Sequence, residues 1–194
     1  MALALEETVE AAVRGGVDWI QIRERELDSA SLLALSQQVK AAALRGATGR
    51  SVKLLVNRRI DIALALPADG AHLGFDAVTA DCAKGLLPSS SLLGYSAHSS
   101  EEVKAAAASS ATYAHLAPIF APLSKASTRA ALGVDALQAA CGHGIAVIAQ
   151  GGVTAANCRE IVIAGAAGVA VTGAILQSSD PEAAAAELRK ALDA

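Results

Sequence analysis

The sequence predicts an α/β protein, a (β/α)8 barrel that lacks its first strand, from three observations. Short apolar runs of strand type alternate with stretches of helical periodicity along the chain, a pattern typical of a parallel sheet covered by helices. Seven such runs are present, each followed by a helical stretch. The last two runs, 146–153 and 168–175, break at small residues, where backbone N–H groups can approach an anion closely. In such barrels the loops after the last two strands frequently hold a phosphate, although tight turns alone would also explain these residues.

The composition fits one domain with a sizeable core, which we expect to span residues 1–194. Apolar residues make up 53% of the chain and aromatic residues 3%, so Ala, Val, Ile and Leu must build the core. A net charge of −3 indicates neither a nucleic-acid partner nor attraction to an anionic membrane surface. Mean hydropathy is +0.41, yet no uncharged apolar run reaches the ~18 residues of a membrane-spanning helix.

The N-terminus and the cysteines favour a cytoplasmic protein. No basic segment precedes Glu6, so the start does not resemble a signal peptide. Cys82, Cys141 and Cys158 lack metal-type spacing, and an odd count without a secretion signal is typical of reduced thiols. We expect structural roles for all three cysteines.

The first half of the chain begins with a helix. Apolar residues at helical spacing predict this helix over 5–14, and the glycines at 15–16 end it. A strand follows over 17–23, and N-cap residues over 28–31 introduce a helix over 31–44. The remaining predicted elements of this half are a strand over 52–57, a helix over 60–66, a strand over 69–74 and a helix over 79–85.

The second half repeats the alternation. A strand over 91–96 precedes a helix to residue 108, whose Ser99 and Glu102 form a start like a capping box. A strand over 112–117 leads into a long loop that contains Lys125. The remaining predicted elements are a helix over 134–141, strands within 146–153 and 168–175 with a helical stretch between them, and a helix to 192 with Pro181 at its first position.

Seven strands are one too few for a closed barrel, and the chain opens on a helix where a strand is expected. Either the sheet is open, or the natural protein carries a further strand upstream. A barrel without that strand would expose two edges, so we favour the second alternative. We expect a natural or ancestral form to carry roughly 10–20 further residues, the length of a strand and a turn.

Chemistry in such a fold lies at the carboxyl ends of the strands. Four cations follow these ends: Arg23, Arg25, Arg58 and Lys125. Guanidinium forks and an ammonium suit phosphate or pyrophosphate, and a concave site would focus their field. Each cation alone could simply face solvent, but four at one rim favour an anionic ligand. The other residues at these ends are Gln21, Asn57, His72, Asp76, Ser96, His98, Gly151, Gly152, Thr172 and Gly173.

The same segments resemble the thiamine-phosphate synthase/TenI family. They follow the family's order from about residue 5 to 176, and together they are highly specific. The resemblance implies a (β/α)8 barrel whose first strand precedes residue 1. The matching segments are Q-I-R-E-R at 21–25, N-R-R at 57–59, A-D-G-A-H-L-G at 68–74, G-Y-S-A-H at 94–98, P-I-F to Lys at 118–125, and the two glycine turns.

The resemblance also implies roles. In the synthase, an aminopyrimidine methyl pyrophosphate loses pyrophosphate, and the nitrogen of a thiazole phosphate captures the cation to give thiamine phosphate. Such a dissociative reaction chiefly needs the charge of its leaving group neutralised. Lys125 and Ser96 would be the catalytic residues, and Gln21 would bind the pyrimidine. The residues implied to hold pyrophosphate are Arg23, Arg25, Asn57, Ser96 and Lys125, and those implied to hold thiazole phosphate are Gly151, Gly152, Thr172 and Gly173.

Two departures from the family pattern concern Mg²⁺. The aspartate of the family's N-D-R motif is Arg58 here, and the position of the second carboxylate is Ala77. Asp76, one place early, is the remaining candidate ligand, which argues against a magnesium site built on two carboxylates. Two interpretations stay open: Arg58 neutralises pyrophosphate directly, or activity is lost and Arg58 faces solvent.

Three functions remain open at this point. The leading hypothesis is a synthase-like transferase of thiamine biosynthesis, acting on small phosphorylated pyrimidine and thiazole substrates. The second is a TenI-like thiazole tautomerase, which uses a histidine after strand six as general acid and base. That position is Pro118 here, and for His115, within the strand, a buried structural role is the simpler expectation. The third is a catalytically retired protein that binds thiazole or thiamine phosphate. The oligomeric state is open, with a homo-oligomer as one option.

Overall fold

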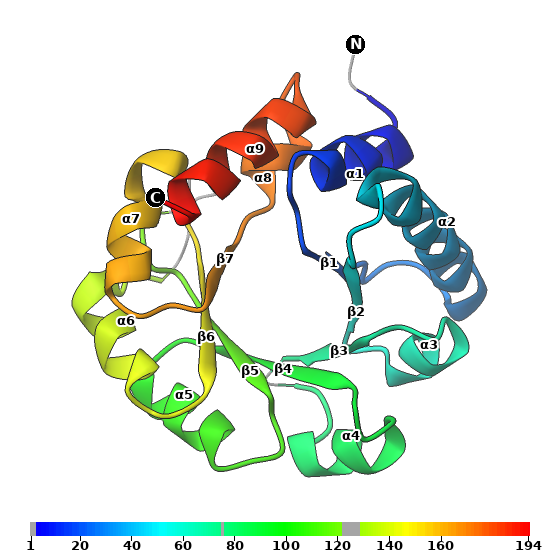
Figure 1. Cartoon of the computed structure of the whole chain (residues 1–194). Helices are drawn as coiled ribbons and strands as arrows, with labels where there is room; N and C mark the ends of the chain where they lie inside the picture. Colours follow the sequence, from blue (N-terminus) through cyan, green and yellow to red (C-terminus); the bar gives the residue numbers. More distant parts are fainter. Residues whose placement is uncertain (1–2, 75, 122–128) are drawn as a thin grey trace.

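Seven parallel strands form a single curled sheet in the computed structural model, which describes residues 3–74, 76–121 and 129–194. The strands follow each other around the sheet in chain order, from β1 to β7. Viewed along its axis, the sheet forms most of a ring, and the helices lie outside it (Figure 1). The predicted α/β barrel architecture with seven strands is therefore confirmed.

The elements agree closely with those expected from the hydrophobic pattern. The strands are β1 (Trp19–Ile22), β2 (Lys53–Asn57), β3 (Gly70–Leu73), β4 (Leu92–Ala97), β5 (Tyr113–Leu116), β6 (Ala146–Gln150) and β7 (Gly168–Ala170). The helices are α1 (Leu5–Arg14), α2 (Ser29–Ala47), α3 (Ile60–Ala65), α4 (Ala80–Leu86), α5 (Ser100–Ala107), α6 (Gly133–Cys141), α7 (Ala155–Ile163), α8 (Gly173–Leu176) and α9 (Pro181–Leu192). Among the described helices, none is long and apolar enough to cross a membrane.

Helix α2 begins earlier and ends later than predicted. Its N-cap is Asp28, whose side chain accepts a hydrogen bond from the Ser31 N–H at 2.8 Å. Gly46 lies within the helix, where its missing side chain lets α2 approach the carbonyl of Glu10 on α1. The helix ends at Thr48, which adopts the left-handed conformation with φ of 44°.

The last strand and the start of α5 can be compared with the prediction in detail. The run 168–175 is strand to Ala170, the predicted break falls at Thr172 and Gly173, and Gly173 begins the short helix α8. At α5, Ser99 accepts the Glu102 N–H as predicted, at 3.1 Å. The Glu102 carboxylate, however, accepts the N–H of His98 rather than that of Ser99. The acidic residue therefore anchors the end of β4 to the helix that follows it.

The apolar core lies between the outer face of the sheet and the helices, in two clusters. In the first, Val56 and Leu73 of the sheet pack with Leu32 of α2. In the second, Leu116 of β5 packs with Leu137 of α6. Because side chains alternate across a strand, the neighbouring positions point into the barrel. The interior is consequently free to carry polar and aromatic groups.

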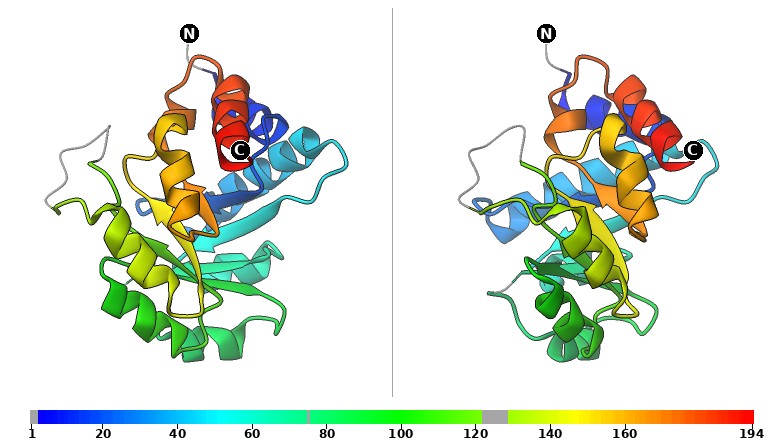
Figure 2. Two further views of the ribbon diagram at one scale, coloured as in Figure 1. Left: turned by 60° about the vertical axis from the view of Figure 1, so that its left-hand side comes forward. Right: turned by 90° about the vertical axis from the view of Figure 1, so that its left-hand side faces the viewer.

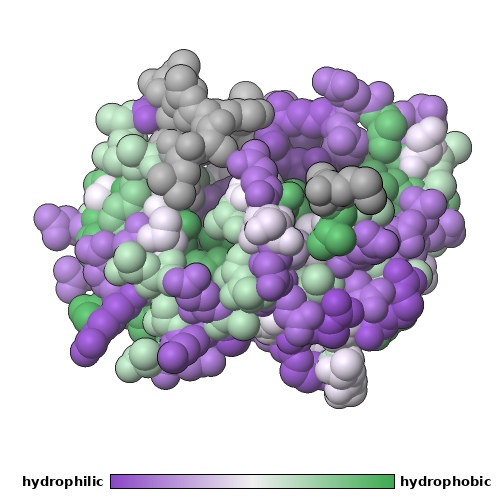
Figure 3. Space-filling model, turned by 90° about the horizontal axis from the view of Figure 1, so that it is seen from above, coloured by the Kyte–Doolittle hydropathy of each residue, from purple (hydrophilic) through white to green (hydrophobic). Residues whose placement is uncertain are grey.

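The layer of helices closes where the sheet does not. Strands β1 and β7 are the two edges of the sheet, and no pairing between them is present among the described residues. Helix α1 packs against both α2 and α9, as the two side views show (Figure 2). Arg14 of α1 donates to Glu182 of α9 at 2.9 Å, and Arg189 donates to Asp18 at 2.8 Å. The face over this junction carries alternating polar and apolar patches (Figure 3).

Candidate functional site

Polar side chains from four adjacent strands meet at the carboxyl end of the sheet. Asn57 at the end of β2 donates from Nδ2 to Oε1 of Gln21 on β1, at 3.0 Å. In the next strand His72 pairs in register with Asn57. The Nε2 atom of His72 lies 2.9 Å from Oγ of Ser96 on β4. The structure therefore brings together four residues that the strand-end argument selected.

Tyr113 extends this arrangement into the barrel. Its hydroxyl lies 3.1 Å from Nδ1 of His72, so His72 links Tyr113 to Ser96. The ring of Tyr113 also meets the edge of Trp19 on β1, with centroids 5.1 Å apart. Rings from strands so far apart in the sheet can touch only across the interior. The hydrogen bond requires Gly94, because a Cβ at this position would clash with both Tyr113 and His72.

Both interior histidines are neutral near pH 7. The pKa of His72 is lowered to about 3. Burial is the main cause of this shift, and the nearby His115 and Arg23 contribute the rest. Burial likewise lowers the pKa of His115 to about 4, against the opposing hydrogen bond from Gln150. A neutral imidazole has one donor and one acceptor nitrogen. The link from Tyr113 through His72 to Ser96 therefore runs in a single direction, set by the tautomer.

His115 fits the structural role expected for it. Its ring centroid lies 4.4 Å from that of His72, inside the barrel, and it lies within strand β5 rather than on a loop. The other predicted framework histidine, His98, approaches the Ala117 carbonyl with Nδ1 at 2.7 Å. His98 thus ties the end of β4 to the end of β5, as loop support.

The predicted cations occupy different surroundings. Arg23 is close enough to His72 to affect its pKa, so its charge lies near the strand ends. Arg25 is exposed, and its backbone N–H donates to the Glu24 side chain at 2.7 Å. Arg58 forms an ion pair with Asp76, with 2.7 Å between Nη1 and Oδ2. Lys125 lies outside the described residues.

The two glycine turns meet the rim on its other side. Gly151 and Gly152 have φ of 94° and 62°, values that glycine adopts without the strain other residues meet. A Cβ on Gly151 would lie 2.7 Å from Pro118 Cβ, and one on Gly152 would lie 2.5 Å from the Ala121 carbonyl oxygen. Within the described chain, the N–H groups of both glycines donate no hydrogen bond and remain available to an anion.

Asn157 is a positioning residue that the sequence argument did not identify. Its Nδ2 donates to the Gly152 carbonyl at 2.9 Å, and its Oδ1 accepts the Thr154 N–H at 2.8 Å. The side chain therefore holds the second glycine against the start of α7. A Thr-x-x-Asn spacing directly after a Gly-Gly turn is the signal that could have indicated it.

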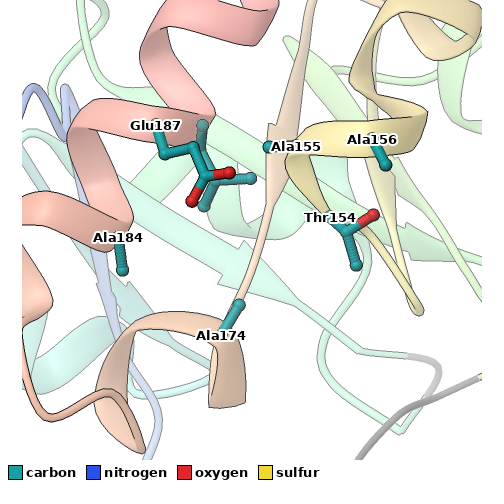
Figure 4. A pocket seen from close by; sticks show the side chains of 7 residues that line it. Thr154, Ala155, Ala156, Ala174, Ala184 and Glu187 are labelled. Carbon is teal, nitrogen blue, oxygen red and sulfur yellow. The ribbon is translucent and has the colours of Figure 1, made fainter.

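A cavity of about 280 Å³ lies behind these turns, among the helices α7, α8 and α9 (Figure 4). The Glu187 carboxylate faces it, and this negative charge disfavours a phosphate (Figure 4). Neither Gly151 nor Gly152 lines it. The cavity is thus separate from the cluster at the strand ends. Its lining residues are Thr154, Ala155, Ala156, Ala174, Ala184, Glu187 and Leu188.

Comparison with known proteins agrees with this geometry. A family model described as thiamine monophosphate synthase matches residues 2–175. A putative thiamine-phosphate synthase from Geobacter sulfurreducens is 42% identical over 175 residues, which cover 89% of this chain and 80% of that protein. The thiamine-phosphate synthase of Roseiflexus castenholzii is 37% identical over 182 residues, covering 93% and 78%. The solved thiamine phosphate pyrophosphorylase from Pyrococcus furiosus superposes with a TM-score of 0.86 at 27% identity, covering 98% of this chain and 90% of that one.

Proposed function

The chain belongs to the thiamine-phosphate synthase family of thiamine biosynthesis, and we propose that it catalyses the reaction of that family's name. In this reaction the C–O bond between the pyrimidine methylene and pyrophosphate breaks, and a C–N bond to the nitrogen of thiazole phosphate forms. The observation that carries the proposal is the cluster of Gln21, Asn57, His72 and Ser96 at adjacent strand ends. We further propose that residues 1–194 act as one domain, in the cytoplasm.

The cluster supports recognition of the pyrimidine pyrophosphate. Asn57 donates to Oε1 of Gln21, so the Nε2 donors of Gln21 would be the ones to bind a ring nitrogen of the pyrimidine. Ser96, oriented through His72, would donate to the pyrophosphate. Arg23 would add positive charge beside it. As the C–O bond breaks, negative charge grows on the pyrophosphate, so these donors bind the transition state more strongly than the ground state.

The glycine turns support recognition of the thiazole phosphate. The N–H groups of Gly151 and Gly152 would donate to its oxygens, beside the turn at Thr172 and Gly173 that follows the neighbouring strand β7. The role of Lys125 as a further pyrophosphate ligand stays a prediction. Two phosphorylated substrates bound at opposite sides of one rim would face each other across the barrel mouth, as the reaction requires.

A turnover assay tests the proposal. The full chain should form thiamine phosphate from the two substrates and release one pyrophosphate for each product molecule. Replacing the predicted pyrophosphate ligand, Lys125→Ala, should lower kcat/KM by about 30–1,000-fold, the loss typical of a donor to developing negative charge. Binding of both substrates without any product would instead identify a retired binding protein. Activity that Lys125→Ala leaves unchanged would remove the pyrophosphate assignment of this residue.

A further inference from the structure

The rim beside Asn57 carries an ion pair at the place where the family pattern has two carboxylates. The first family carboxylate is replaced by Arg58 and the second by Ala77. Asp76 already has a cation as partner, since its Oδ2 lies 2.7 Å from Nη1 of Arg58. A magnesium ion at this point would meet one paired carboxylate and a guanidinium of like charge. These residues do not fit a metal held by two carboxylates.

We propose that the guanidinium of Arg58, held in place by Asp76, binds the pyrophosphate of the substrate directly. The pyrophosphate half of the site then operates without a bound Mg²⁺, because a side chain of the protein supplies the positive charge. This inference rests on the proposed function, since it concerns the same pyrophosphate. It goes beyond the proposed function by naming Arg58 as the cation that neutralises the leaving group.

The backbone of Arg58 supports a functional reason for its position. Its φ of 65° lies in the left-handed region, which Gly, Asn and Asp adopt readily and other residues rarely do. The conformation is held by β3, because the Arg58 N–H donates to the His72 carbonyl at 2.8 Å. Sparsely populated conformations of this kind cluster at ligand sites. Here the conformation carries the guanidinium to Asp76, beyond the end of β3.

The ion pair leaves most of the guanidinium available. A guanidinium has five N–H donors in a planar fork, and Nη1, at one end of the fork, makes the 2.7 Å contact with Asp76. The side chains of Arg58 and Asp76 are 33% and 39% exposed, so a ligand can reach them. Gly74 makes room for the carboxylate, since a Cβ there would lie 3.2 Å from Oδ1 of Asp76. Bidentate binding of a phosphate by the free N–H groups is the geometry for which arginine is suited.

The neighbouring arginine provides a matched control. Arg59 carries the same charge one residue later, but it pairs with Asp61 and donates to Oγ of Ser29 at 2.7 Å. These partners lie at the start of α3 and in α2, outside the sheet. Arg59 is therefore paired with groups on the two helices rather than with Asp76. Its replacement removes one positive charge without touching the proposed contact.

Calorimetric titration of the full chain with inorganic pyrophosphate tests the inference. In a buffer with EDTA, the wild-type protein should bind pyrophosphate, and Arg58→Asn should weaken binding roughly 10–100-fold, the loss expected for a charge-assisted pair. Asn tolerates the left-handed conformation, so the backbone should keep its path. Arg59→Ala should change the affinity by less than about twofold, because the charge of Arg59 is already paired with Asp61, outside the proposed contact.

A second variant tests the relation to the metal. Arg58→Asp should make pyrophosphate binding depend on Mg²⁺, with roughly tenfold or greater strengthening, because it places a second carboxylate beside Asp76. The wild-type affinity should change by less than about threefold on adding Mg²⁺, since a guanidinium already supplies the charge. Pyrophosphate binding that Arg58→Asn leaves unchanged, or wild-type binding that needs Mg²⁺, would overturn this inference while leaving the proposed function in place. A wild-type protein that binds no pyrophosphate under either condition would overturn both.

Discussion

The two sides of the barrel mouth, each of which we propose to bind an anion, are built by different means. We call the first the side-chain rim, formed by Gln21, Arg23, Asn57, Arg58 and Ser96, and the second the backbone rim, formed by Gly151, Gly152, Thr172 and Gly173. In the side-chain rim, hydrogen bonds and an ion pair between side chains hold the groups in place. In the backbone rim, close packing against the loop after β5 holds the glycines.

This difference explains where the sequence could depart from its family. A side chain in the side-chain rim can change without moving the strand that carries it, as at Arg58. In the backbone rim, a side chain on Gly151 or Gly152 would collide with Pro118 or Ala121. We therefore expect changes at the first side to alter chemistry and changes at the second to alter the fold. The variants below are chosen to separate these two effects, from the largest to the smallest.

Acid should destabilise the protein through the histidines beneath the side-chain rim. The pKa of His72 is about 3 and that of His115 about 4 in the folded protein, against 6.5 when unfolded. Between these values the unfolded state binds more protons, so stability is complete above pH 6.5 and is lost as the pH falls. As the pH falls from 6.5 to 4.5, the two histidines should together lower the free energy of unfolding by about 3–5 kcal/mol.

Urea unfolding at several pH values measures this loss. His72→Gln should roughly halve the change in the free energy of unfolding between pH 6.5 and 4.5, because the variant lacks one of the two titrating groups. An unchanged dependence in this variant would show that His72 is protonated equally in both states. The backbone rim, which has no titrating group, should contribute nothing to the slope.

Gly152→Ala should be the most damaging single change in the backbone rim. The new Cβ would lie 2.5 Å from the Ala121 carbonyl oxygen at a φ of 62°, so we expect a loss of about 2–4 kcal/mol in the free energy of unfolding. Gly144→Ala is the matched control, with a φ of 78° but no described atom within 4 Å of the added Cβ. It should cost about 1 kcal/mol, the backbone strain alone.

Chemical denaturation measures the free energy of unfolding of both variants. The difference between the two values isolates the contribution of packing at Gly152. Thiazole phosphate binding by calorimetry should be lost in Gly152→Ala and kept in Gly144→Ala. Equal stabilities would mean that packing does not hold the backbone rim, and the comparison with the side-chain rim would fail.

Ser96→Ala should affect the reaction more than the fold. Removing the hydroxyl 2.9 Å from His72 should lower kcat/KM about 10–100-fold, the value of a hydrogen bond to a charged leaving group. Ser100→Ala removes a similar serine–histidine contact, at 2.8 Å from His143, at the start of helix α5. That control should keep full activity. Steady-state kinetics on both variants decides whether Ser96 acts on the substrate.

Tyr113→Phe should have the smallest effect, because the hydroxyl acts through His72. Without its partner 3.1 Å away, His72 can change tautomer and orient Ser96 less well. We expect kcat to fall about 3–10-fold with KM nearly unchanged, and stability to fall by about 1 kcal/mol. Tyr95 is the other tyrosine of the chain, and Tyr95→Phe should change neither kcat nor stability. A fall in stability with kcat unchanged would limit Tyr113 to a structural role.

Most of the fold followed from local patterns in the sequence. The alternation of apolar runs with helical periodicity depends only on neighbouring residues, so the strand order and helices were predictable. So was the gathering of Gln21, Asn57 and Ser96, because parallel strands carry their carboxyl ends to one edge. The family motifs added the expected substrates, and the comparisons confirmed the family. The roles of individual site residues stay predictions.

The tertiary structure decided what depends on contacts between distant segments. The ion pair of Arg58 with Asp76 requires the left-handed backbone at residue 58, which pairing with β3 holds. The contact of Tyr113 with His72 requires the strands β3 and β5 to approach each other across Gly94 of β4. No local pattern records either condition, because each depends on the register and curvature of the sheet. The sequence thus determined which residues reach the rim, and the packing of the strands decided which partners they meet there.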